Sequence, residues 1–411
     1  MPLLYVCSLS GSIPAILKLI NLMSLKLVYL DKVITFSLAS FVCFSFFSIS
    51  LTQISCGIGG LAWAVKCCLT RSWGKQNFPL KIPVLIFVFA CFVAVAGAME
   101  FLESYKSLKR LLEILIFFWA VNCIDSQDLR ERLTILLIAS ATLSTFTGFY
   151  NSWENGITHI HRAEGTMSVY MTYAGLLMLA LLVASGKLIF APKENKWIYI
   201  AFTMISVCLL FTFTRQAWLG ALAGGIYLIW FRKKILLWFV PVILGVIFMI
   251  SPASIKYRIN TLTNLEDANL KIRMALWHGG WLVFKDHPII GCGFKCIDVV
   301  NKNYPDPTGD INRLRGMHNN FIQLAVDTGL FGLISWISIW VVYFMTLYQR
   351  FIVMDGDLAY KKDAMGSAAA VMGFLVAGIF ETNFYDSEVS MLLYFIMALP
   401  FTTNCKKAIS K

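Results

Sequence analysis

Long apolar segments alternate with short polar segments over most of the chain, from about Val33 to Thr402. Most of these apolar segments are long enough to cross a hydrocarbon core about 30 Å thick as a helix. We predict spans at 34–50, 51–69, 82–98, 111–124, 133–149, 169–186, 197–213, 216–231, 235–251, 321–348, 364–380 and 389–404. The pattern therefore predicts an all-α, polytopic integral membrane protein with about 12 transmembrane helices.

The same pattern divides the chain into five parts. Residues 1–32 are predicted to be an N-terminal interfacial or cytoplasmic segment, because Lys18 and Lys26 interrupt a moderately apolar stretch that resembles an amphipathic helix more than a secretory signal. Residues 33–251 carry the first nine spans, 252–320 form one large loop, 321–404 carry the last three spans, and 405–411 form a tail.

The large loop is predicted to contain a helix over 270–284 that is rich in aromatic residues, including Trp277. Asp286-His-Pro288 ends this helix, and Gly291-Cys-Gly293 follows as a turn. Cys292 and Cys296 are the plausible disulfide pair of the chain, and the sequence leaves open whether the bond forms.

Composition and charge support this interpretation and orient the chain. Only 14 % of the 411 residues are charged and 58 % are apolar, which excludes a soluble enzyme. The net charge of +12 does not indicate nucleic acid, because every segment on one side of the predicted spans carries two or three basic residues. The positive-inside rule assigns that side to the cytoplasm, so both termini are predicted to be cytoplasmic and the large loop periplasmic.

Charged residues near the membrane are costly, and they gather at the predicted outer side. Each has a simpler alternative role: Arg215 as an interfacial anchor, Arg273 as a solvated helix residue, and His318 as a structural histidine. Their shared placement instead forms a basic rim suited to an anionic lipid headgroup, since guanidinium groups bind phosphate in a bidentate manner. The rim also includes Arg162, Glu164, Lys109, Arg110, Trp277 and Asn319. No metal-ligand spacing and no cofactor motif occurs in the sequence.

Four motifs, taken together and in their order along the chain, resemble those of the O-antigen ligase family, which also contains O-antigen polymerases. They are Arg162-Ala-Glu-Gly165; Phe211-Thr-Phe-Thr-Arg-Gln-Ala-Trp218; Arg273-Met-Ala-Leu-Trp277 followed by Asp286-His-Pro-Ile-Ile-Gly-Cys-Gly293; and His318-Asn-Asn-Phe-Ile-Gln-Leu, which continues to Gly332. The resemblance implies a metal-independent glycosyltransferase of the bacterial inner membrane. Its donor would be a glycan on undecaprenyl pyrophosphate, and its acceptor a hydroxyl of the lipid A core oligosaccharide on the periplasmic face.

Carried over motif by motif, the resemblance implies catalytic roles for three residues. Arg215 and Arg273 would bind the pyrophosphate, and His318 would orient or deprotonate the acceptor hydroxyl. Glu164 is a rival base. Arg162, Glu164, Asn319, Trp277, Lys109 and Arg110 would contribute to substrate binding.

Two alternatives stay open at this point. An O-antigen polymerase would use the same chemistry with a growing glycan as acceptor. A flippase or transporter of lipid-linked saccharides would also be polytopic, but transporters place polar sites near the membrane midplane. Here the ionisable residues avoid the centres of the predicted spans, which favours an enzyme at the interface.

Overall fold

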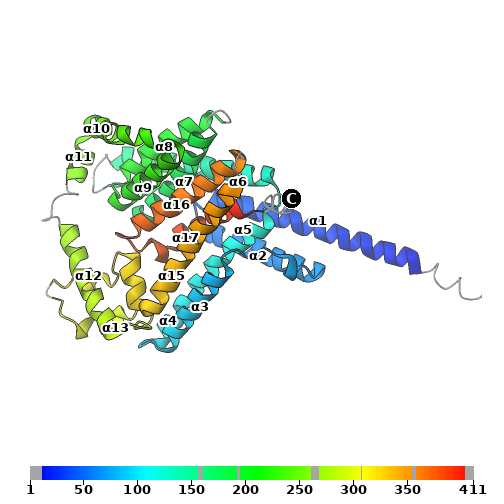
Figure 1. Cartoon of the computed structure of the whole chain (residues 1–411), viewed down its shortest axis with the longest axis horizontal. Helices are drawn as coiled ribbons and strands as arrows, with labels where there is room; N and C mark the ends of the chain where they lie inside the picture. The colour runs from blue at the N-terminus through cyan, green and yellow to red at the C-terminus, as the bar shows by residue number, and fades with distance from the viewer. Residues whose placement is uncertain are drawn as a thin grey trace, which may run out of the picture.

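The protein is a bundle of helices in a computed structural model (Figure 1). The structure describes residues 12–155, 161–191, 195–260, 268–306, 308–353 and 358–402, and these residues contain no strand. The α-helices are α1 (Ser12–Phe44), α2 (Ile49–Thr70), α3 (Lys81–Ala96), α4 (Phe101–Ser107), α5 (Leu115–Cys123), α6 (Gln127–Asn155), α7 (Tyr170–Phe190), α8 (Trp197–Phe211), α9 (Arg215–Arg232), α10 (Val240–Ile250), α11 (Ala253–Asn260), α12 (Ala268–Asp286), α13 (Ile297–Val300), α14 (Asp310–Leu314), α15 (Asn320–Val353), α16 (Leu358–Ala377) and α17 (Ser387–Ala398). Short 3₁₀ segments include η2 (Leu108–Ile114), η3 (Lys234–Phe239), η5 (Asn383–Tyr385) and η6 (Leu399–Phe401).

The all-α prediction is confirmed, and a helical segment lies at each predicted span. Four helices are long and apolar enough to cross a membrane within the described ranges, at 24–44, 127–153, 170–190 and 320–350. The number of twelve crossings stays a prediction. The first helix differs from the prediction: α1 continues without a break through residue 32, and the turn that ends it lies at residues 45–48, where Ser48 caps α2. Residues 1–11 and 405–411 of the predicted terminal segments lie outside the described residues.

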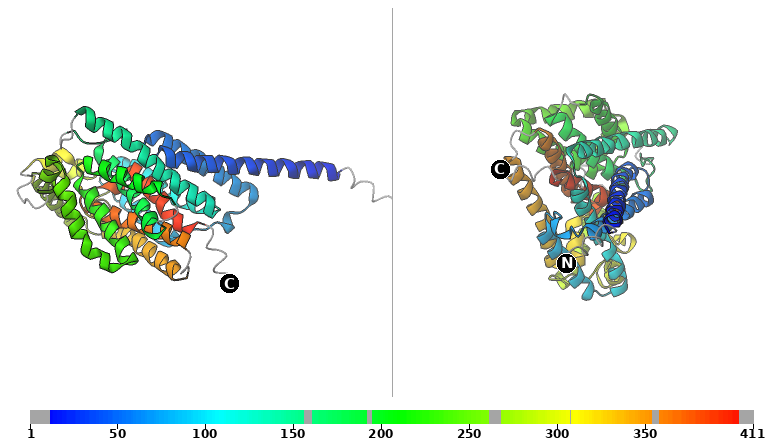
Figure 2. Two further views of the ribbon diagram at one scale, coloured as in Figure 1. Left: turned by 90° about the horizontal axis from the view of Figure 1, so that it is seen from above. Right: turned by 90° about the vertical axis from the view of Figure 1, so that its right-hand side faces the viewer.

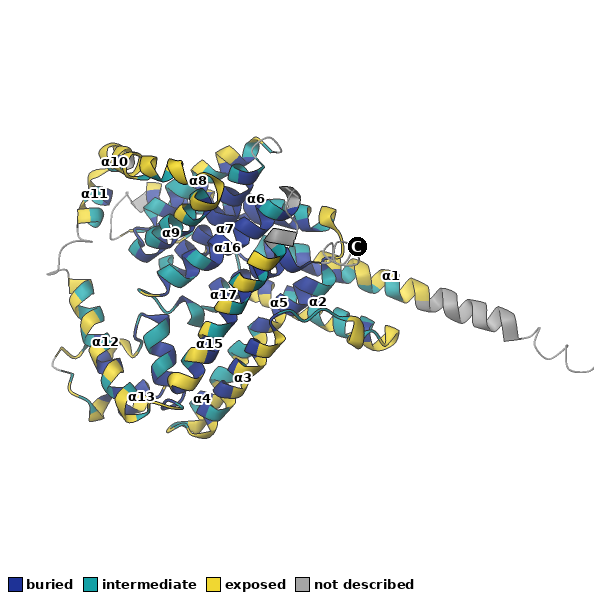
Figure 3. Ribbon diagram, in the orientation of Figure 1, coloured by how far each residue is buried: buried dark blue, intermediate teal, exposed yellow. Residues whose placement is uncertain are grey.

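The bundle has two distinct ends. Helices α4, α12 and α13 lie together at one end, and α1 protrudes at the other (Figures 1 and 2). The interior is formed by α7, α16 and α17, which are buried along most of their length (Figure 3). Large apolar side chains such as Phe36 and Phe89 are exposed on the outer faces of α1 and α3, as expected for surfaces that contact lipid.

Helices α9 and α16 pack with their backbones in contact. A methyl group added at Gly220 of α9 would lie 2.5 Å from the Gly373 carbonyl oxygen of α16, and one added at Gly224 would lie 2.7 Å from the Ala369 carbonyl oxygen. Small residues four apart on each helix permit this approach, as in other membrane bundles. The contact fixes the start of α9 beside the end of α16.

This contact leads to a stability prediction. We expect Gly220→Ala to lower the free energy of unfolding by about 1–3 kcal/mol, because the methyl group overpacks the α9–α16 contact. Gly225→Ala in the same helix is the matched control, since a methyl group there meets nothing within 4 Å. Thermal denaturation of the purified variants in detergent measures both effects, and equal midpoints for the two variants would contradict the packing argument.

Helix α15 is interrupted, where the sequence predicts a continuous helix. Gly329 has φ 64° and ψ −168°, and the break exposes backbone groups that the preceding loop satisfies. Leu330 N donates to the Pro288 carbonyl (2.8 Å), Cys292 N to the Val326 carbonyl (3.0 Å) and Gly293 N to the Asp327 carbonyl (3.1 Å). Glycines in the Pro288–Gly293 loop and at Gly329 therefore allow the backbone of the loop to contact the backbone of α15. Cys292 and Cys296, which form a disulfide, lie in this docked loop.

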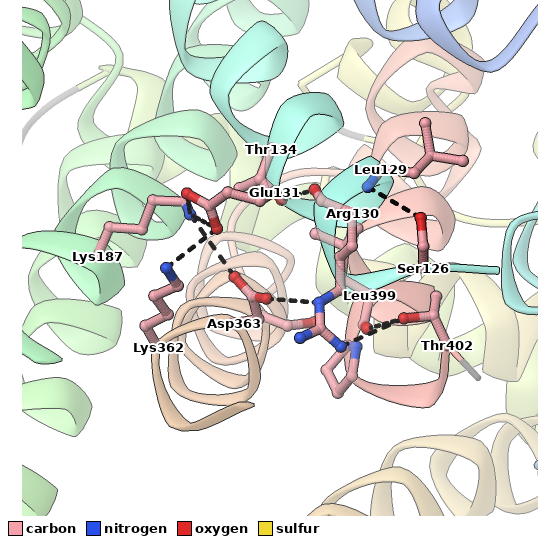
Figure 4. Close-up of polar contacts among 12 residues, drawn as sticks. Ser126, Leu129, Arg130, Glu131, Thr134, Lys187, Lys362, Asp363, Leu399 and Thr402 are labelled. Atoms are coloured by element: carbon pink, nitrogen blue, oxygen red, sulfur yellow. Dashed lines mark hydrogen bonds and ion pairs between the residues drawn. The ribbon is translucent and has the colours of Figure 1, made fainter. Parts of the chain in front are cut away.

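The end of the bundle where α7 terminates contains a buried network of charges (Figure 4). Arg130 Nε lies 2.8 Å from Asp363 Oδ2, Lys187 Nζ lies 2.7 Å from Glu131 Oε1, and Lys362 Nζ lies 3.0 Å from Glu131 Oε2. The sequence interpretation uses these bases only as markers of orientation. In the structure, these basic side chains form ion pairs that connect α6, α7 and α16.

Candidate active site

Four arginine side chains converge on one cavity of about 310 Å³. They come from four separate segments: Arg162 precedes α7, Arg215 begins α9, Arg258 lies on α11 and Arg273 lies on α12. Tyr170, Thr214, Gln216, Asn269 and Phe380 also line the cavity. A concentration of guanidinium groups around one cavity is suited to a phosphate or pyrophosphate group.

Backbone contacts bring three of these segments together. Ala163 N donates to the Phe211 carbonyl (3.0 Å), which places Arg162 beside the end of α8. Phe213 has a left-handed backbone (φ 51°), and its carbonyl accepts a hydrogen bond from Arg258 Nε (3.3 Å). The sharp turn Phe211-Thr-Phe-Thr214 thus both starts α9 at Arg215 and orients Arg258.

The helix that carries Arg215 adds to the positive potential. Arg215 is the first residue of α9, where backbone N–H groups without helical partners and the helix dipole favour an anion. The Arg162 guanidinium lies 4.2 Å from the centre of the Tyr170 ring, which holds it at the cavity by a cation–π contact.

His318 is paired with a partly buried carboxylate. Its Nδ1 lies 3.0 Å from Glu381 Oε1, and the other carboxylate oxygen accepts from Gln216 Nε2 at 3.4 Å. Burial raises the pKa of the Glu381 carboxyl, but the hydrogen bond and charge of His318, the backbone N–H of Thr382 and the charge of Arg273 together lower it below its ordinary value. Since a carboxylate can only accept, Nδ1 carries the proton and Nε2 is left as the basic nitrogen.

Glu381 also connects His318 to the arginine cavity. Its hydrogen-bond donor Gln216 and its neighbour Phe380 both line the cavity, directly beside Arg215. His318 itself has a left-handed backbone (φ 46°). Two of the six non-glycine left-handed residues in the described chain, Phe213 and His318, therefore belong to this site, and such strain is common at functional sites.

Trp277 and Asn319 lie at the site and make structural contacts there. Trp277 Nε1 donates to the Met317 carbonyl (3.0 Å), and its ring packs on Phe380. Asn319 Oδ1 accepts from Phe321 N (2.8 Å) and Ile322 N (3.1 Å), which makes it the cap of α15. Their predicted role in substrate binding stays a prediction.

Like His318, Trp277 and Asn319, three further predicted site residues do not line the arginine cavity. Glu164 and Lys109 are exposed outside it. The Arg110 guanidinium lies 5.0 Å from the centre of the Tyr385 ring, in a separate small pocket between α3, η2 and η5. The predicted basic rim is therefore at least two separate places rather than one.

An apolar groove adjoins the arginine cavity. It has a volume of about 600 Å³, lies between α8, α9 and α10, and shares Arg215 and Leu219 with the cavity. Aliphatic and aromatic side chains such as Phe202, Leu222 and Ile243 form almost all of its lining. A ligand with one anionic group and one long apolar group fits this pair of spaces.

Sequence reasoning missed Arg258, Gln216 and Glu381. Arg258 lies in a short helix with no motif around it, so nothing in the sequence separates it from other loop bases. Glu381 did carry a signal, because it directly follows the predicted span 364–380 and a carboxylate at a span end is costly.

These features define a helical membrane protein in which four arginines from separate segments line one cavity. Residues 199–337, about a third of the chain, match the family described as O-antigen ligase. The match contains Arg215, Arg258, Arg273 and His318, and it confirms the resemblance seen in the motifs. The family comprises glycosyltransferase-like enzymes of lipopolysaccharide biosynthesis and covers both O-antigen ligases and polymerases. No curated protein matches the chain.

Proposed function

We propose that the protein is an O-antigen ligase that moves a glycan from undecaprenyl pyrophosphate to a hydroxyl of the lipid A core oligosaccharide. The reaction takes place on the periplasmic side of the bacterial inner membrane, with both termini in the cytoplasm. The observation that carries this proposal is the arginine cavity joined to an apolar groove at Arg215. The cavity accepts the pyrophosphate and the groove accepts the beginning of the polyprenyl chain.

One further observation supports the periplasmic orientation, and a second supports a bundle that spans the membrane. The disulfide between Cys292 and Cys296 belongs to the end of the bundle that carries α12, and disulfides persist in oxidising compartments. Tyr170 at the cavity and Lys187 in the charged network lie on one helix, about 25 Å apart at 1.5 Å per residue. The two polar ends of the bundle are thus separated by nearly the thickness of a hydrocarbon core.

The proposed reaction is a direct displacement at the anomeric carbon. The acceptor hydroxyl forms the new glycosidic bond, the bond between the anomeric carbon and the pyrophosphate oxygen breaks, and the hydroxyl proton passes to Nε2 of His318. Glu381 holds the His318 ring and stabilises the imidazolium that forms. Arg162, Arg215, Arg258 and Arg273 stabilise the negative charge on the departing pyrophosphate. One displacement inverts the anomeric centre.

Turnover in the presence of a chelator tests this proposal. We expect purified protein to transfer glycan from the lipid-linked donor to lipid A core at an undiminished rate in excess EDTA, because the arginines neutralise the leaving group. The measurement is product formation on a gel with and without EDTA. Activity that EDTA abolishes and magnesium or manganese restores would contradict an arginine-based mechanism.

The polymerase remains the second candidate, since the family contains both activities and the cavity suits both. Deletion of the gene separates them. Loss of all capped lipopolysaccharide identifies the ligase, whereas a shift to caps of a single repeat identifies the polymerase. A flippase or transporter of lipid-linked saccharides would instead move the donor across the bilayer without forming a glycosidic bond.

A further inference from the structure

We propose that Gln323 and Asp327 are positioning residues that hold His318 in its working orientation. The proposal rests on the proposed function, because it assigns His318 the role of proton acceptor. It concerns residues one and two turns into α15, which lie behind His318 and line neither the cavity nor the groove.

The residue before His318 is held at both of its backbone groups. Met317 N donates to Gln323 Oε1 (2.9 Å), and the Met317 carbonyl accepts from Trp277 Nε1 (3.0 Å). The two peptide planes that flank Met317 are therefore both held: the plane before it from α15, and the plane that leads into His318 from α12. This matters because His318 adopts a left-handed backbone (φ 46°), which a residue with a side chain keeps only when its surroundings enforce it.

Asp327 determines which way the Gln323 amide faces. Gln323 Nε2 donates to Asp327 Oδ1 (3.0 Å), and Tyr385 Oη donates to Asp327 Oδ2 (2.6 Å). A carboxylate only accepts, so the amide nitrogen of Gln323 must point to Asp327 and its oxygen must point to Met317 N. Without Asp327, the Gln323 amide could rotate by about 180° and point its NH₂ group at Met317 N–H, so that two donors would face each other.

Burial of the Asp327 carboxylate costs free energy, which suggests that the residue has a function. Asp327 is 1 % exposed, and a buried carboxylate is retained only with strong partners. Its backbone carbonyl accepts from Gly293 N (3.1 Å), and the Arg110 guanidinium lies 5.0 Å from the ring of Tyr385. The chain of contacts thus runs from Arg110 through Tyr385, Asp327 and Gln323 to the backbone N–H of Met317, the residue before His318.

An exchange of the amide and the carboxylate between positions 323 and 327 tests this arrangement. Gln323→Glu alone sets two carboxylates against each other, whereas Gln323→Glu with Asp327→Asn restores every bond: the carboxylate at position 323 accepts from Met317 N and from the new amide, whose oxygen accepts from Tyr385. Gln323→Leu removes the acceptor without adding charge. Tyr343→Phe is the matched control, since it removes a different buried hydrogen bond of α15, the one between the Tyr343 hydroxyl and Ser367 far from the site.

Two readouts separate positioning from general stability. The first is steady-state glycan transfer. We expect Gln323→Leu and Gln323→Glu to lower kcat roughly 10- to 100-fold with little change in the donor KM, because a small displacement of a catalytic group costs that much. The loss in Gln323→Glu increases with pH, as a proton shared by the two carboxylates is released. The double variant recovers to within about threefold at every pH, a residual of less than 1 kcal/mol.

The second readout does not need activity. Diethyl pyrocarbonate modifies histidine side chains, and mass spectrometry gives the rate at His318 relative to exposed His278 on α12. We expect a several-fold change in that ratio in Gln323→Leu and Gln323→Glu, and the wild-type ratio in the double variant and in Tyr343→Phe.

The outcomes distinguish this proposal from the proposed function. Folded single variants with wild-type kcat and wild-type His318 labelling would overturn the positioning role, as would a folded double variant that recovers neither. If wild-type protein transfers no glycan from the lipid-linked donor, the proposed function fails, and the labelling ratios still decide whether Gln323 and Asp327 position His318.

Discussion

Replacement of His318 by alanine is expected to lower the rate of glycan transfer about 10²–10⁴-fold, the usual contribution of a general base. Binding of the lipid-linked donor is expected to remain, because the arginines that line the cavity come from other segments. The fold is also expected to remain, since Glu381 keeps its contacts with Gln216 and the Thr382 backbone. Donor binding and turnover are therefore measured on the same purified variant.

His278→Ala, at an exposed position on α12, controls for the loss of a histidine. A His318→Ala protein that binds donor and turns over within about threefold of wild type, a difference below 1 kcal/mol, would remove His318 from the mechanism. A purely structural histidine would give a different pattern, in which activity falls only in proportion to the amount of folded protein.

Arg258 is expected to be as important as Arg215, although no motif marks it. Loss of one charge-assisted hydrogen bond to a phosphate costs about 1.5–3 kcal/mol, which corresponds to roughly a 10- to 150-fold loss of activity. Arg215→Lys and Arg258→Lys are expected to show most of this loss, because an ammonium group cannot reproduce the planar fork of a guanidinium. For Arg258 the substitution also removes the Nε–H that contacts the Phe213 carbonyl.

The matched control is Arg313→Lys, at an exposed arginine that pairs with Asp310 on α14 outside the cavity. Initial rates at saturating acceptor, at equal amounts of folded protein, provide the comparison. If Arg215→Lys and Arg258→Lys transfer glycan as fast as Arg313→Lys, the four arginines are anchors or structural groups and the pyrophosphate lies elsewhere.

Much of the fold was predictable because a bilayer restricts the choice of structure. Backbone groups in hydrocarbon must bond within their own segment, so every long apolar run had to be a helix. The interruption of α15 was not predictable in the same way. From the sequence, Gly329 is expected to be an ordinary glycine inside a helix. Its left-handed backbone is explained only by the Pro288–Gly293 loop, whose backbone hydrogen-bonds to α15 at this point.

The site was predictable to the extent that motifs recorded it. Arg162, Arg215, Arg273 and His318 lie in quoted motifs, and the structure brings the three arginines to one cavity and His318 to its edge. Lys109 and Arg110 were included because they share the outer side of the membrane. The side of the membrane predicts how deep a residue lies, but not where it lies within the membrane plane. These two residues lie at η2, away from the arginine cavity.

The buried charges at the end of α7 impose an order on how the chain is made. Arg130 and Lys187 are synthesised long before Asp363, their shared partner on α16. At roughly 5–20 residues per second, the ribosome reaches position 363 on the order of ten to fifty seconds after position 130. Lys187 can pair with Glu131 of α6 before then, but Arg130 gains its carboxylate partner only when α16 arrives, so the buried network is complete only at that point. Insertion of the late helices is thus the step that closes the bundle.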